Sequence, residues 1–132
     1  MSRVQLGLNV GDLDAAVDFY QRAFGVPPAK LRPGYANFVV DQPPLKLVLF
    51  ENERGGTINH LGVEVKDTTA VHAATRRLAE AGLDQRIEDG VDCCHAVQDK
   101  VWVVDPDGVE WEWYTVLADS PTGEMATAAT CC

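Results

Sequence analysis

Apolar and polar residues alternate along two short stretches that align with each other without a gap. Residues 5–12 read QLGLNVGD and residues 60–67 read HLGVEVKD, so leucine, glycine, an aliphatic residue, valine and aspartate recur in the same positions. Such alternation is typical of a strand with one buried face. Because a helical pattern follows each copy, the repeat indicates an internal duplication.

The two helical patterns are amphipathic and have recognisable ends. Apolar residues recur at helical spacing over Leu13–Phe24 and over Val71–Ala81, which predicts helices that pack on a sheet. Asp12 is the expected N-cap of the first helix, and Asp67 or Thr68 that of the second. The glycines expected to end them are Gly25 and Gly82.

Short β-prone runs follow each helix, and a turn separates the last two. The runs are Tyr35–Val40, Leu45–Glu51, Ala96–Gln98, Lys100–Val104 and Val109–Val116. Asp105–Gly108 has the composition of a tight turn. The chain is therefore predicted to be α+β, with two βαβββ modules over residues 1–56 and 57–117 and a disordered tail over residues 118–132.

Composition narrows the classes of partner. With 132 residues and 46% hydrophobic content, the chain is long enough for one domain or two small modules. A formal charge of −9 disfavours nucleic acid and anionic membranes. No apolar run reaches the length of a signal peptide or a membrane span, so we expect a cytoplasmic protein. The four cysteines form two adjacent pairs, Cys93-Cys94 and Cys131-Cys132, and are expected to be free thiols.

Three polar residues on the predicted strands are candidate metal ligands. Gln5 and His60 occupy the same position of the repeat, on the face opposite the apolar residues and beside a glycine that leaves room for a bound group. Glu112 lies on the last predicted strand. A histidine, a carboxylate and a third donor resemble an incomplete facial triad with open positions. The alternative is that all three are ordinary polar residues on solvated sheet faces.

The repeated strands, the Asp-capped helices and the segment from Asp105 to Tyr114 (DPDGVEWEWY) resemble the vicinal oxygen chelate superfamily of glyoxalase, bleomycin-resistance and extradiol dioxygenase proteins. The resemblance extends to about Leu117 and implies paired βαβββ modules that form a curved mixed sheet around a metal site. Residues 44–50 (PLKLVLF) provide no carboxylate at the place of a fourth ligand, which argues against a glyoxalase.

Four longer motifs resemble the carbon-arsenic lyases and the related cadmium-induced proteins within that superfamily. They are Arg32–Phe38, Pro43–Leu49, Asn59–Val65 and Cys93–Trp102. The resemblance implies an iron(II)-dependent dioxygenase that cleaves methyl or aromatic trivalent arsenicals to arsenite and confers arsenical resistance. It assigns Gln5, His60 and Glu112 to iron, and Cys93 and Cys94 to the substrate.

Several further roles follow as expectations or stay open. Trivalent arsenic is a soft centre that suits two thiolates. Cys93 and Cys94 are expected on a loop, and residues 88–92 just before them are also expected to be a loop. Tyr35 and Lys100 line the pocket or simply pack in strands. The rival functions are soft-metal binding without turnover and metal-free ligand binding of the bleomycin-resistance kind. Both a monomer and a homodimer, with modules paired within one chain or swapped, are compatible with the sequence.

Overall fold

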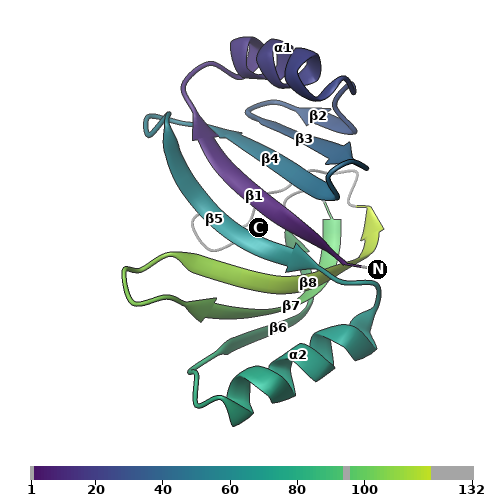
Figure 1. The fold of residues 1–132 in the computed structure, drawn as a ribbon, viewed down its shortest axis with the longest axis vertical. Coiled ribbons are helices and arrows are strands. Elements are labelled where there is room, and N and C mark those ends of the chain that lie inside the picture. The colour runs from purple at the N-terminus through teal and green to yellow at the C-terminus, as the bar shows by residue number, and fades with distance from the viewer. Residues whose placement is uncertain (1, 94–95, 120–132) are drawn as a thin grey trace. The chain divides into compact units, whose positions relative to one another are not determined.

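The computed structural model describes residues 2–93 and 96–119, which contain eight strands and two helices (Figure 1). In chain order they are β1 (Arg3–Val10), α1 (Leu13–Phe24), β2 (Lys30–Arg32), β3 (Tyr35–Val40), β4 (Leu45–Glu51), β5 (Thr57–Glu64), α2 (Thr68–Glu80), β6 (Arg86–Cys93), β7 (Ala96–Val104) and β8 (Glu110–Asp119). The order β-α-β-β-β therefore occurs twice, and the predicted α+β fold class is confirmed. Neither helix has the length and apolar character needed to span a bilayer.

The chain forms two compact units, one over Arg3–Leu61 and the other from Gly62 onward together with Ser2. In the first unit the strand order is β2-β3-β4-β1-β5. β1 pairs with β4 in parallel, whereas β3 is antiparallel to both of its neighbours. Helix α1 covers one face of these strands (Figure 1). Leu6, Leu8 and Val10 pack in that core, which confirms the predicted apolar face of β1.

The second unit contains the end of β5 from Gly62 and has the strand order β8-β7-β6. β7 is antiparallel to both β6 and β8. Helix α2 packs Val71 and Leu78 against Val101, so this unit has a core of its own. The turn before β8 is as predicted. The backbone N–H of Gly108 donates to the carbonyl of Asp105 at 3.0 Å, and the N–H of Asp105 donates to the carbonyl of Val109 at 2.9 Å.

The helix ends match the sequence signals. The Asp12 carboxylate accepts a hydrogen bond from the backbone N–H of Ala15 at 3.1 Å, and Asp67 accepts one from Ala70 at 2.8 Å. Such caps satisfy amide groups that have no partner within the first turn. Gly25 ends α1 in the left-handed region with φ 72°, where a side chain would be strained.

Four parts of the fold differ from the prediction. The runs Ala96–Gln98 and Lys100–Val104, predicted separately, form the single strand β7. β2 has only three residues, too few to show the alternation of apolar and polar residues by which a strand is predicted from the sequence. Residues 88–92, expected to be a loop, belong to β6, which pairs with β7 through a bulge between Glu88 and Val91. β6 stands at the end of the strand order, and acidic residues on such an edge strand hide its β character while protecting it from aggregation. β8 continues to Asp119, two residues past the predicted boundary, and the rest of the predicted tail lies outside the described residues.

Candidate metal centre

The side chains of Gln5 and His60 meet inside the first unit. Their Nε2 atoms lie 3.1 Å apart, and each residue is only 2% exposed. β1 and β5 are neighbouring strands, so the two equivalent positions of the repeat face each other across one strand pair. Both residues are buried, which contradicts the alternative that they are ordinary polar residues on a solvated sheet face.

Gly7 leaves room for the imidazole ring. A methyl group at this position would lie 2.8 Å from the backbone oxygen of His60 and 3.2 Å from its ring atoms. Real Cβ atoms do not approach backbone oxygen that closely. The glycine of the repeated motif is therefore required by the packing of a neighbouring strand: the space that the sequence predicted for a bound group is taken at this position by the backbone and ring of His60.

His60 is held on its other side by Asn59, whose Oδ1 lies 2.8 Å from His60 Nδ1. An amide oxygen can only accept, so Nδ1 donates and the lone pair of the neutral ring belongs to Nε2. That lone pair accepts a hydrogen bond from the Gln5 amide. A metal ion takes the same kind of lone pair, and a histidine ligand usually donates its other N–H in this way. The donor chemistry therefore fits a metal ligand.

An aromatic row lies beside His60. The ring of Phe50 is 5.8 Å from the imidazole, and the ring of Tyr35 is 5.7 Å from Phe50 (centroid distances). Tyr35 is 4% exposed, and its hydroxyl accepts a hydrogen bond from Asn37 at 3.0 Å. Tyr35 thus belongs to the packed polar and aromatic surroundings of His60 within its own unit.

Glu112 lies in the other unit, on β8, and is fully buried. Its Oε1 is 2.9 Å from Nζ of Lys100, which is also fully buried. Register explains the contact, because Lys100 is opposite Tyr114 and Glu112 is opposite Trp102 on the same face of β7 and β8. The Lys100 ammonium also faces the rings of Trp102 and Tyr114 at 5.4 and 5.9 Å. The Glu112 carboxyl group thus lies against the Lys100 side-chain nitrogen as an ion pair, and a carboxylate is a group that can bind a metal.

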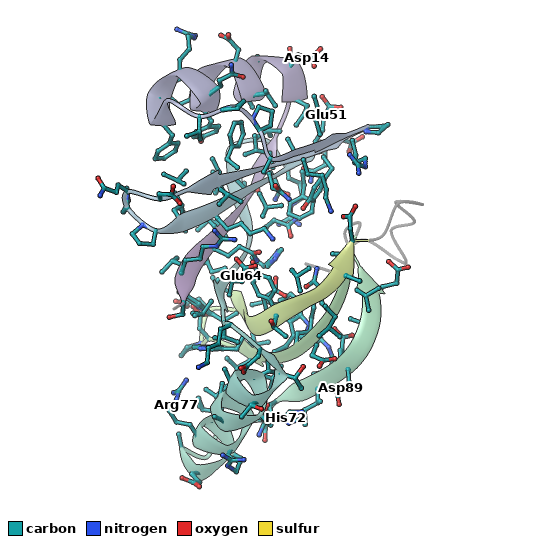
Figure 2. The ribbon with its side chains drawn as sticks, turned by 90° about the vertical axis from the view of Figure 1, so that its right-hand side faces the viewer. Asp14, Glu51, Glu64, His72, Arg77 and Asp89 are labelled. Carbon is teal, nitrogen blue, oxygen red and sulfur yellow. The ribbon has the colours of Figure 1, made fainter. Side chains whose placement is uncertain are left out.

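The residues of the predicted thiol clamp are only partly described. Cys93 is the last residue of β6, and its backbone pairs with Ala96, so it ends a strand and is not within a loop as expected. Cys94, His95, Cys131 and Cys132 lie outside the described residues. His72 is exposed on α2 (Figure 2) and takes no part in these contacts.

Sequence reasoning missed the partners of the candidate ligands. Among the described residues, no three His, Cys, Asp or Glu side chains lie together as a metal-binding group. The predicted ligand set contains one histidine, one glutamate and the amide of Gln5, so it does not meet that description. Asn59 and the counter-ion role of Lys100 were not foreseen. Asn59 had a signal, since it precedes His60 directly. The Lys100 pair had none, because it depends on strand register.

Comparison with known proteins shows the family of this chain and two similar relatives. The model of the Glyoxalase/Bleomycin resistance protein/Dioxygenase superfamily matches residues 3–113. The cadmium-induced protein CadI of Mycobacterium tuberculosis is 63% identical over 92% of this chain and 81% of its own length. A trivalent organoarsenical cleaving enzyme of Thermomonospora curvata is 53% identical over 100% of this chain and 89% of its own length.

Solved structures show the same fold at low sequence identity. A Mn(II)-bound glyoxalase from Novosphingobium aromaticivorans has a TM-score of 0.65 and 22% identity, covering 96% of this chain and 44% of its own. An extradiol ring-cleaving dioxygenase from B. fuscum has a TM-score of 0.64 and 18% identity, covering 89% of this chain and 33% of its own.

Proposed function

The chain belongs to the glyoxalase, bleomycin resistance protein and dioxygenase superfamily, and on that premise we propose that it cleaves the carbon-arsenic bond of trivalent organoarsenicals and releases arsenite. The observation that carries the proposal is the buried pair of Gln5 and His60, in which the bond from His60 Nδ1 to Asn59 leaves the lone pair of the ring on Nε2. The identity of 53% to a trivalent organoarsenical cleaving enzyme supports it.

Gln5, His60 and Glu112 are the proposed iron(II) ligands. Bound iron(II) supplies the activation of dioxygen, the co-substrate. His60 offers Nε2, held in place through Nδ1 by Asn59. Gln5 binds as a ligand only through its amide oxygen, so its amide group must turn relative to the contact it makes with His60. Glu112 offers a carboxylate, which pairs with Lys100.

Cys93 and Cys94 are the proposed substrate clamp. A methyl or aryl arsenical in the trivalent state has two exchangeable oxygen substituents, and two thiols replace both with loss of water. Holding arsenic in one place then supplies much of the rate acceleration, because the reacting bond is fixed in position. Tyr35 and Lys100 are the proposed lining of the substrate pocket.

The activity test is arsenic speciation. The reduced protein is loaded anaerobically with iron(II) and given methylarsonous acid, and air is then admitted. We expect arsenite to accumulate over many turnovers, and we expect none in a matched anaerobic sample. A C93S/C94S variant should bind iron as before and release little arsenite. Absence of arsenite from the aerobic sample, with the thiols titrated as reduced, would reject the proposal.

Gln5 can be tested separately as a ligand. Imidazole binds iron(II) more strongly than an amide oxygen, so Gln5→His is expected to keep or raise the iron affinity, and Gln5→Ala to lower it. Anaerobic equilibrium titration measures both. Equal affinities for the native protein and the two variants would remove Gln5 from the ligand set.

A second candidate function is binding of a soft metal ion or metalloid without turnover. The 63% identity to proteins named as cadmium-induced favours it. The two functions differ in one measurement: a binding protein retains stoichiometric metal or arsenical and gives no product. A metal-free binding module of the bleomycin-resistance kind would retain no iron on Gln5, His60 and Glu112.

A further inference from the structure

A continuous row of hydrogen bonds leads from a backbone carbonyl to the ring of His60, within the unit Arg3–Leu61. Thr57 Oγ1 donates to the carbonyl of Arg54 at 2.6 Å, and Asn9 Nδ2 donates to Thr57 Oγ1 at 2.8 Å. Asn59 Nδ2 donates to Asn9 Oδ1 at 2.8 Å, and Asn59 Oδ1 lies 2.8 Å from His60 Nδ1.

The direction of every bond in this row is fixed by its first member. A carbonyl can only accept, so the single hydroxyl proton of Thr57 is committed to Arg54. Thr57 must then accept from Asn9, which places the amide nitrogen of Asn9 toward Thr57 and its oxygen toward Asn59. Asn59 therefore donates to Asn9 and turns its own oxygen toward His60.

A second anchor fixes Asn9 in the same orientation. The backbone N–H of Arg54 can only donate, and it donates to Asn52 Oδ1 at 2.8 Å. The amide nitrogen of Asn52 then faces Asn9 and donates to its Oδ1 at 2.7 Å. Turning the Asn9 amide over would break the bonds from both Asn52 and Asn59. The carbonyl and the N–H of Arg54 thus impose the same orientation on Asn9, which is only 2% exposed.

We propose that Asn9 and Asn59 are positioning residues that hold His60 in the tautomer with hydrogen on Nδ1, so that Nε2 carries the lone pair on the side of Gln5. A free histidine ring divides its proton between the two nitrogens, and only one of these forms presents Nε2 as a ligand. The Asn9-Asn59 relay selects that form in advance of metal binding. Its importance for iron rests on the proposed function, whereas the tautomer itself does not.

Nitrogen NMR of the metal-free protein measures the tautomer directly. The chain has three histidines, so a H72Q/H95Q background leaves His60 as the only signal. We expect the two-bond and three-bond couplings to show hydrogen on Nδ1 and a bare Nε2. Hydrogen found on Nε2 overturns the proposal without any further variant.

Two matched variants in that background test the relay. Asn59→Leu removes the acceptor and should shift the tautomer population toward Nε2–H. Thr57→Val removes the first anchor but leaves the Arg54-Asn52 anchor intact, so it should leave the tautomer unchanged. An unchanged tautomer in Asn59→Leu, or an equal shift in both variants, contradicts the proposal.

Anaerobic titration with iron(II) alone tests the consequence. Loss of a ligand's hydrogen-bond partner commonly costs 10- to 100-fold in metal affinity. Asn59 is itself exposed, so water can partly replace it, and we expect about a tenfold loss in Asn59→Leu and almost none in Thr57→Val. If the tautomer shifts as expected but iron affinity does not change, the relay stands and the role of His60 as a ligand fails.

Discussion

The buried pair of Lys100 and Glu112 leads to a prediction that separates a structural from a metal-binding role of Glu112. Lys100→Met keeps the length and the apolar stem of the side chain but removes its charge. Both residues are 0% exposed and their charged atoms lie 2.9 Å apart. The variant therefore leaves a buried carboxylate without its counter-ion.

The expected cost is large compared with the stability of a small protein. Removing one member of a buried ion pair destabilises by about 3 to 5 kcal/mol, whereas the total unfolding free energy of a native protein is about 5 to 15 kcal/mol. Replacing both members, as in K100M/E112M, removes the charge together with its partner and should recover most of the loss.

Bound iron(II) should reverse the effect in the single variant if Glu112 is a ligand. The metal then supplies the positive charge that Lys100 no longer provides. A full recovery of about 3 to 5 kcal/mol corresponds to an affinity gain of about two to three and a half orders of magnitude, at 1.4 kcal/mol for each factor of ten. We expect Lys100→Met to bind iron at least about tenfold more tightly than the native protein.

Urea unfolding under anaerobic conditions, with a chelator and then with excess iron(II), measures both effects. The dependence on urea concentration should keep its slope, so that a change in midpoint reports stability alone. In the absence of metal, a loss of unfolding free energy below about 1 kcal/mol for Lys100→Met would refute the argument that the ion pair is buried and that water does not take the place of Lys100. Equal stabilisation of the native protein and Lys100→Met by iron would remove Glu112 from the ligand set.

Three further variants test the packing that supports the site. Gly7→Ala places a methyl 2.8 Å from the His60 backbone oxygen, so it should lower the unfolding free energy by about 1 to 3 kcal/mol and weaken iron binding. Gly11→Ala is the control, because a methyl there has nothing within 4 Å and should change neither quantity. Equal losses of stability for the two variants in urea unfolding would contradict this prediction. Asp12→Ala should lower the unfolding free energy by about 1 kcal/mol through loss of the α1 cap. Asp12→Ser, which keeps a capping oxygen, should keep most of that stability in the same measurement. Leu49→Ala, in the fully buried core, should cost about 2 to 5 kcal/mol, and a loss comparable to that of Asp12→Ala would show a looser core.

Much of the fold could be predicted because its signals are local. Alternation along β1 assigned its apolar face, and the Asp12 and Asp67 caps and the turn from Asp105 to Gly108 are each complete within a few residues. β6 escaped prediction because its strand character comes from pairing with β7 and not from its own composition.

The sequence by itself also determined that Gln5 and His60 are equivalent positions, since duplication repeats the strand that bears them. Only the tertiary structure decided what surrounds them. The register of β7 on β8 brings Lys100 to Glu112, and the approach of β5 to β1 connects Asn59 to Asn9 and requires glycine at position 7. Such contacts join residues far apart in the chain, and the one-dimensional pattern of apolar and polar residues sets which face a side chain takes but not which partner it meets.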